Sequence, residues 1–135
     1  MLRKQLVSVT AVAVLTTGVA FAAVQQDRVM YRQADGTYVV NTTSLCSNVK
    51  GFKGATPVEV YIKNNKVIKV EALQNREGPQ FYDKVKQGLF PKFNGMKLSK
   101  AAKAESLDGV TGATYTSRAV KENIAAAVAY YKKNK

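Results

Sequence analysis

Residues 58–72 read VEVYIKNNKVIKVEA, and this stretch decides the fold. Its first half alternates valine and isoleucine with charged or aromatic residues, and apolar residues resume at Val67 after Asn64-Asn65. Alternation with a period of two is typical of a strand that buries one face. We therefore expect a β-hairpin across residues 58–72, with its valines in the core and its charged side chains in solvent.

The segments before this hairpin predict further sheet. Residues 30–32 and 37–41 flank Asp35-Gly36, a dipeptide that permits the positive φ angles of a tight turn. They should form a first hairpin. Residues 41–56 are rich in Thr, Ser, Asn and Gly, which favours a loop or an irregular strand.

The segments after the hairpin predict two helices. A short middle helix should run from Pro79 to Gly88 with one core stripe, made of Phe81, Tyr82, Val85 and Leu89. An amphipathic helix should occupy residues 118–133, with Thr116 or Ser117 as its N-cap and one apolar side made of Val120, Ile124, Val128 and Tyr131. Residues 91–106 are expected to form a loop containing at most one short strand. The prediction is one small α+β domain: an antiparallel sheet of hairpins, a short middle helix and a C-terminal amphipathic helix.

The first residues have the layout of a secretory signal peptide. Arg3 and Lys4 precede an uncharged run from Leu6 to Val24, and Ala20-Phe21-Ala22 supplies the small residues of a cleavage site. We expect residues 1–22 to be the signal peptide and residues 23–135 to be the mature domain. An uncleaved membrane anchor is the alternative, because the run could just span a bilayer. Either arrangement puts the domain outside the cytoplasmic membrane.

The composition excludes most kinds of catalytic site. The 135 residues include no histidine and a single cysteine, Cys46. Catalytic triads, imidazole zinc sites, haem attachment and cysteine-ligated clusters are therefore ruled out, so we expect no catalytic residues and no metal site. Redox chemistry would have to come from an organic cofactor.

The net charge points to anionic partners. It is +12 for the whole sequence, and without Arg3 and Lys4 it is +10, from 19 basic and 9 acidic residues. Scattered lysines and export argue against nucleic acid. Solvated faces, an anionic membrane surface or an acidic redox partner would each explain the charge.

The most informative segment is residues 108–117, DGVTGATYTS, directly before the last predicted helix. Small residues and hydroxyls at a helix start allow close backbone approach, free N–H donors and the positive end of a dipole, which together suit a phosphate. On this pattern alone the segment is either an anion site or a Ser/Thr-rich loop that caps the helix.

This segment resembles the attachment signature of the FMN-binding domain family, which includes flavinylated subunits of sodium-pumping NADH:quinone reductases. The signature is Asp-x-x-Ser/Thr-Gly-Ala-Thr-x-Ser/Thr, and it is matched by Asp108, Thr111, Gly112, Ala113, Thr114 and Thr116. Upstream, Asp35-Gly36-Thr37-Tyr38, Gly51-Phe52-Lys53-Gly54 and the main hairpin are similar to the early part of the family fold. One departure is Glu77-Gly78-Pro79-Gln80, where many members have Glu-Thr-Pro-Gly close to the flavin.

The resemblance favours an exported electron carrier over an independent enzyme. A separate magnesium-dependent transferase would move FMN from FAD onto the Thr114 hydroxyl, leaving a covalent phosphoester. Thr111 and Thr116 would hydrogen-bond the phosphate, and Asp108 would orient the loop or serve the transfer. The expected cofactor-binding residues are Thr114, Asp108, Thr111, Gly112, Ala113, Thr116, Ser117 and Glu77.

The expected partners are the flavin transferase, redox donor and acceptor proteins or a membrane electron-transfer complex, and an anionic membrane surface. Two alternatives stay open at this point. The domain could bind FMN without a covalent bond or serve only as a docking module, or it could be a basic exported surface-binding protein. Lys97 or Lys100 is expected to lie near the flavin ring and to stabilise its reduced, anionic form.

Overall fold

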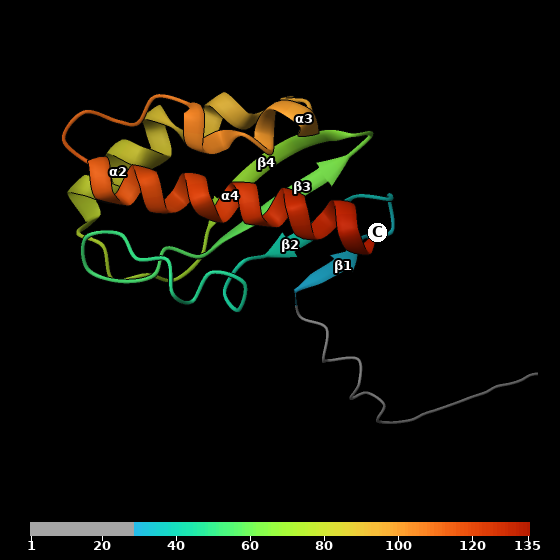
Figure 1. Cartoon of the computed structure of the whole chain (residues 1–135), viewed down its shortest axis with the longest axis horizontal. Helices are drawn as coiled ribbons and strands as arrows, with labels where there is room; N and C mark the ends of the chain where they lie inside the picture. Colours follow the sequence, from blue (N-terminus) through green and yellow to red (C-terminus); the bar gives the residue numbers. More distant parts are fainter. Residues whose placement is uncertain (1–28) are drawn as a thin grey trace, which may run out of the picture.

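The strands of the protein form one antiparallel sheet in the order β1-β2-β3-β4 (Figure 1). The computed structural model describes residues 29–135. The strands are β1 (Met30–Arg32), β2 (Tyr38–Asn41), β3 (Val58–Lys63) and β4 (Lys66–Ala72). The helices are α2 (Pro79–Gly88), α3 (Leu98–Ala101) and α4 (Thr114–Asn134), with the 3-10 turns η1 (Phe90–Phe93) and η2 (Ala104–Ser106). The predicted α+β fold is thereby confirmed.

Both predicted hairpins are present. β1 pairs with β2 across the Asp35-Gly36 turn, and β3 pairs with β4 across Asn64 and Asn65. These two asparagines have φ angles of 54° and 64°, which asparagine tolerates better than most residues because its short side chain can bond locally. The turn thus fixes the register of the main hairpin.

One irregularity in β4 departs from simple alternation. The pairing shifts between Tyr61 and Ile62 of β3, which pair with Lys69 and Val67, so that Ile68 is an extra residue. This bulge lets both Val67 and Val70 face the core although they are three positions apart, and it leaves Ile68 44% exposed.

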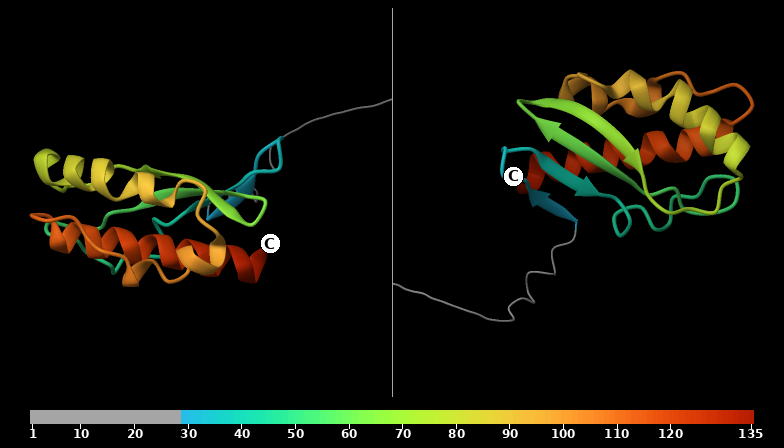
Figure 2. Two further views of the ribbon diagram at one scale, coloured as in Figure 1. Left: turned by 90° about the horizontal axis from the view of Figure 1, so that it is seen from above. Right: turned by 180° about the vertical axis from the view of Figure 1, so that it is seen from behind.

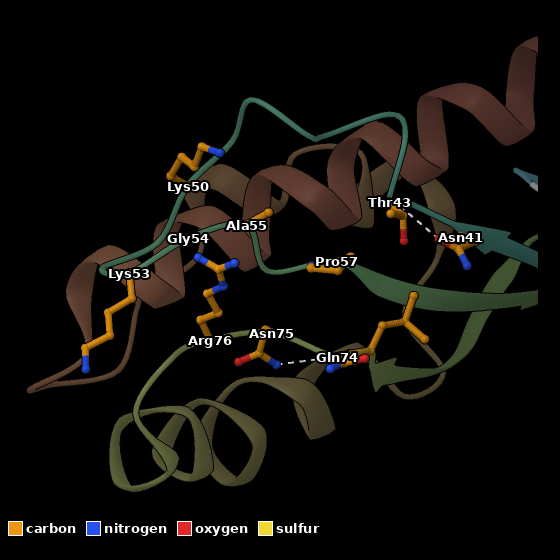
Figure 3. A pocket seen from close by; sticks show the side chains of 11 residues that line it. Asn41, Thr43, Lys50, Lys53, Gly54, Ala55, Pro57, Gln74, Asn75 and Arg76 are labelled. Carbon is orange, nitrogen blue, oxygen red and sulfur yellow. Dashed lines mark hydrogen bonds between the residues drawn. The ribbon is translucent and has the colours of Figure 1, made fainter.

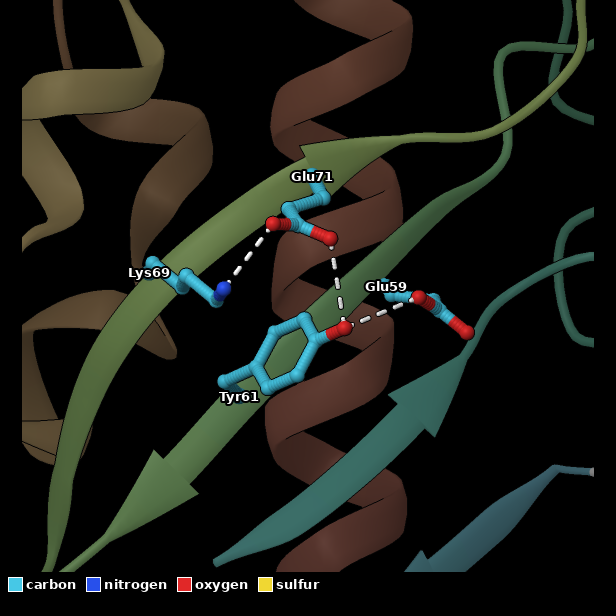
Figure 4. A network of polar contacts seen from close by, with 4 residues as sticks. All are labelled: Glu59, Tyr61, Lys69 and Glu71. Carbon is cyan, nitrogen blue, oxygen red and sulfur yellow. Dashed lines mark hydrogen bonds and ion pairs between the residues drawn. The ribbon is translucent and has the colours of Figure 1, made fainter.

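Helix α4 lies along one face of the sheet (Figure 2). Its predicted apolar side is buried as expected, and it packs on the inward valines and isoleucine of β2 and β3. The outer face of the sheet is polar: the Tyr61 hydroxyl is hydrogen-bonded to Glu59 and Glu71, and Lys69 pairs with Glu71 at 2.9 Å (Figure 4). This division produces a two-layer molecule with α4 against the sheet.

Residues 91–106 differ from the prediction of a loop with one short strand. They form η1, α3 and η2, and Leu98, Ala101 and Ala104 are buried against the core at a helical spacing of three. Just before α3, the backbone N–H of Val67 donates to Met96 O at 2.8 Å, so this segment also covers the edge of β4. These short helices and turns could not be predicted from the sequence, because each is too short to show a periodic pattern.

The expected leader lies outside the described residues. Within residues 29–135, no helix has both the length and the apolar character needed to cross a bilayer.

Candidate functional site

The start of α4 and the loop before it bring most of the predicted site residues together. Asp108, Thr111 and Gly112 are exposed along the loop, Ala113 is buried, and Thr114 is the exposed first residue of the helix. Gly112 has a φ of 87°, a conformation that costs a residue with a Cβ but is open to glycine. The motif therefore needs its glycine for backbone shape.

The expected N-cap is wrong. The N-cap residue is Ala113, no side chain caps the helix, and the first helical hydrogen bond runs from Ser117 N to Ala113 O at 2.9 Å. The backbone N–H groups of Thr114, Tyr115 and Thr116 consequently have no acceptor among the residues described. Three free donors at the positive end of a 21-residue helix are suited to bind a phosphate. The reading of the motif as a capped loop is not supported.

The hydroxyls of Thr116 and Ser117 hold the loop in place. Both side chains are buried in the first turn of α4. Ser117 Oγ accepts a hydrogen bond from Val110 N at 3.0 Å, and Thr116 Oγ1 donates to Glu77 Oε1. The Thr116 hydroxyl is thus already committed, and its backbone N–H is the group left for an anion.

The start of the loop is fastened to α4 as well. Lys121 Nζ donates to Leu107 O at 2.6 Å. Asp108, the next residue, has an exposed side chain with no hydrogen bond or ion pair to the described part of the chain. Its carboxylate is therefore accessible from solvent, as is the side chain of Thr111.

Glu77 joins the loop of residues 51–54 to α4. Its carboxylate accepts backbone hydrogen bonds from Phe52 N at 2.8 Å, Lys53 N at 2.7 Å and Gly54 N at 3.2 Å, besides the one from Thr116. Burial acts to raise the pKa of Glu77, but the hydrogen bonds from Thr116 and the three amides outweigh it, so that the pKa lies below its usual value. Glu77 is thus an ionised clamp behind the site.

The clamp explains one glycine of the loop. A Cβ on Gly51 would lie 2.6 Å from Glu77 Oε1, closer than Cβ atoms approach other heavy atoms, so glycine lets the carboxylate reach the amides without a shift. Gly51 N also donates to Gly54 O at 2.8 Å and closes the turn, which we call the Gly51–Gly54 turn.

The turn contributes to an aromatic pocket beside Thr114. The pocket has a volume of about 180 Å³ and is lined by Phe52, Phe81 and residues 112–116. Three aromatic side chains are exposed here: Phe52 (65%), Tyr115 (59%) and Phe81 (38%). The Phe52 ring lies 6.5 Å from that of Phe81 and 6.4 Å from that of Tyr115, measured between centroids. Exposed aromatics grouped at one place mark a binding surface for a flat apolar ligand.

Sequence reasoning missed these aromatic residues. Phe81 was expected in the core with Tyr82, Val85 and Leu89; those three are buried, whereas Phe81 faces the pocket. Phe52 stands in a polar loop whose role the pattern did not reveal, and a large aromatic between glycines was the available signal. At Gly78, where the sequence departs from the family pattern, a Cβ would lie 3.1 Å from the exposed Phe81 ring, which would have to shift by a few tenths of an ångström.

One basic residue beside the site is Lys84, on α2. A Cβ on Gly112 would lie 3.3 Å from Lys84 Nζ, which places this ammonium group over the loop. Lys97 and Lys100, which were expected near the ring, do not line the aromatic pocket. The backbone of Lys97 pairs with that of Lys66, at the turn of the main hairpin. Lys100 lies on α3, away from the start of α4 (Figure 1).

Comparison with known families agrees with this geometry. The family model for the FMN-binding domain matches residues 51–129, a span that holds the Gly51–Gly54 turn, Glu77, the loop and most of α4. A comparison with curated proteins found no significant match. The residues present suit the cofactor, since free amides and Lys84 can hold a phosphate and the aromatic pocket can hold a ring. The chain therefore belongs to the FMN-binding domain family.

Proposed function

We propose that this protein is an exported flavoprotein that carries FMN covalently, through a phosphoester on Thr114, and transfers electrons between redox partners outside the cytoplasm. The observation that carries the proposal is the position of Thr114. Its exposed hydroxyl has no hydrogen-bond partner within residues 29–135, and it lies on the wall of the aromatic pocket next to three free backbone donors. A phosphate esterified there would be attached and neutralised by the same turn of helix.

In the attachment reaction, Thr114 Oγ1 would lose its proton and bond to the phosphorus of the FMN half of FAD. The bond between the two phosphates would break and AMP would leave, so the reaction is a transfer that needs no oxidant. The chain offers no histidine to take the proton. A separate transferase would catalyse this step and would read the exposed loop of Asp108, Thr111 and Gly112.

The aromatic side chains would hold the flavin ring. A volume of about 180 Å³ lies below the roughly 300–1,000 Å³ typical of pockets that enclose a ligand, so part of the ring would stay in solvent. The cofactor would supply the redox chemistry, since flavins accept and release electrons. An exposed ring edge suits exchange with a partner protein, and no substrate pocket is needed beside it.

Export is supported by the signal-peptide pattern of residues 1–22. A covalent bond would be useful outside the cell, where a dissociated cofactor is lost. The mature N-terminus is expected at Ala23, and N-terminal sequencing of the exported protein would establish it. An intact Met1 would instead establish the uncleaved anchor.

The deciding experiment loads the protein by co-expression with a flavin transferase. The parent should gain one FMN per chain by intact mass and should fluoresce on a denaturing gel, where a non-covalent flavin is lost. Thr114→Val keeps the side-chain shape and removes the oxygen, so it should stay folded and unmodified. Thr111→Val, which changes another exposed threonine of the same loop, should reduce loading without abolishing it, because Thr111 could supply at most a hydrogen bond worth about 1 kcal/mol.

Two outcomes would reject the covalent form of the proposal. A parent protein that binds FMN but loses it on denaturation would be a non-covalent FMN-binding module. Covalent flavin on Thr114→Val would show that the attachment site lies elsewhere.

A further inference from the structure

A second, larger cavity shares the Gly51–Gly54 turn with the aromatic pocket. It is a groove of about 830 Å³ between residues 50–57 and residues 73–76, with Asn41 and Thr43 at one end (Figure 3). Phe52 lines the aromatic pocket, while its neighbours Lys53 and Gly54 line the groove. The two sites are therefore separated by a single turn of chain.

The groove is positively charged. Its lining residues include Lys50, Lys53 and Arg76 and no acidic residue. None of these three cations forms an ion pair within residues 29–135. Figure 3 shows Arg76 extending from one wall of the groove toward Gly54 on the other. The adjacent Glu77 carboxylate is buried and bonded to the backbone of the turn, and it forms no ion pair with these cations within residues 29–135.

The size and the other lining groups narrow down the ligand. The volume is near the upper end of the roughly 300–1,000 Å³ range of ligand pockets, far more than one phosphate fills. No aromatic side chain lines the groove, so a nucleotide base would find no stacking surface. The Gln74 amide and the Nδ2 group of Asn41 offer polar groups of the kind that bond a peptide backbone, whereas the Asn75 amide is already bonded to Leu73 O and Glu77 N.

We propose that this groove is a docking site for a carboxylate-rich segment of a protein partner. Three unpaired cations in a concave channel complement carboxylates spaced along an extended chain, whereas a membrane presents a flat surface of headgroups. A segment docked there would contact the same turn that carries Phe52 and would lie next to the aromatic pocket. The binding itself needs no flavin, so it goes beyond the proposed function and can be tested on protein purified without cofactor.

The test uses a dye-labelled hexaglutamate peptide and measures fluorescence anisotropy with the flavin-free protein at low ionic strength. The groove variant combines Lys50→Glu with Arg76→Glu. The control variant combines Lys100→Glu with Lys103→Glu, two exposed lysines at the α3 end of the molecule, and it has the same net charge. The groove variant should bind the peptide roughly tenfold more weakly than the parent, and the control less than about threefold more weakly.

Three results would overturn the proposal: no binding by the parent, equal weakening in the two variants, or groove-dependent binding of phosphatidylglycerol vesicles without binding of the peptide. Equal weakening would mean a general effect of charge, and the vesicle result would mean a membrane surface. Thermal unfolding followed by circular dichroism shows whether each variant folds. If the groove variant does not fold, Lys50→Gln with Arg76→Gln takes its place, and unchanged peptide affinity in that variant would also reject the groove. Loss of covalent flavin loading would leave this result unaffected.

Discussion

Glu77→Gln tests the clamp that holds the Gly51–Gly54 turn on α4. In the parent, Oε1 accepts from Phe52 N and the Thr116 hydroxyl, and Oε2 accepts from Lys53 N and Gly54 N. Glutamine has the same shape but has one oxygen and one NH₂ group. The oxygen should face Lys53 and Gly54, because neither backbone N–H can reverse its direction. The NH₂ group can then donate to Thr116, whose hydroxyl rotates, but it opposes Phe52 N–H.

The expected loss of stability follows from these hydrogen bonds. One partly buried N–H loses its acceptor, at about 1–3 kcal/mol, and the remaining bonds lose their charge, so we expect the free energy of unfolding to fall by about 2 kcal/mol. For a domain of this size that corresponds to a Tm lower by roughly 10 °C. The effect should appear locally as faster hydrogen exchange at Phe52, the residue that also lines the aromatic pocket.

Urea unfolding of the parent and of Glu77→Gln measures this difference. Glu71→Gln is the matched control, because Glu71 pairs with Lys69 on the exposed face and should change stability by less than about 1 kcal/mol. If both variants unfold within about 0.5 kcal/mol of the parent, the clamp contributes nothing and the reasoning fails.

The pH dependence gives an independent check with a defined sign. The folded-state pKa of Glu77 lies below its usual value of 4.5, so its contribution is complete above that pH and is lost as pH falls through the folded pKa. The difference in stability between the parent and Glu77→Gln should therefore shrink below about pH 4.5. A difference that stays constant into acid would show that the ionised carboxylate is not its cause.

Three further variants probe the pocket. Gly112→Ala should lower the free energy of unfolding, measured in urea, by about 1–2 kcal/mol, because a residue with a Cβ is strained at a φ of 87°. It should also slow flavin loading. Unchanged stability would contradict the positive φ angle at Gly112. Phe52→Ala should raise the rate at which iodide quenches the flavin in loaded protein, and an unchanged rate would remove Phe52 from the ring site. Lys84→Met should lower the reduction potential in spectroelectrochemistry, whereas Lys86→Met, whose ammonium group pairs with Asp83, should not; equal shifts would reject a specific role for Lys84.

Local patterns predicted the elements whose causes are local. Asn64 and Asn65 fixed the main hairpin, and the apolar side of α4 identified the helix and the face that it buries. The bulge at Ile68 was beyond prediction, because two adjacent apolar residues can satisfy either register. Likewise, α3 and its neighbouring turns are too short to carry a period of their own.

The binding loop was predictable for a similar reason. Its glycine and threonines lie close together in the chain, so the motif contains most of the proposed phosphate site. The pocket depends on contacts between distant residues: Glu77 reaches Phe52 across 25 positions and Thr116 across 39. Such pairs leave no periodic trace in one sequence. The cap was mispredicted because Thr116 and Ser117 suit that role locally, whereas the Thr116 hydroxyl donates to the distant Glu77 and Ser117 Oγ accepts from Val110 N in the loop.

The shared Gly51–Gly54 turn has a thermodynamic consequence. A ligand that binds in the groove and fixes the turn in one conformation would change the binding free energy of a ligand that contacts Phe52 on the same turn. Linkage requires the second ligand to change the binding free energy of the first by the same amount. Glu77 limits the movement of the turn, because its carboxylate is bonded to three backbone N–H groups of the turn. Weakening the hydrogen bonds of Glu77 would therefore reduce the coupling free energy between the two cavities, and the change would be the same for both ligands.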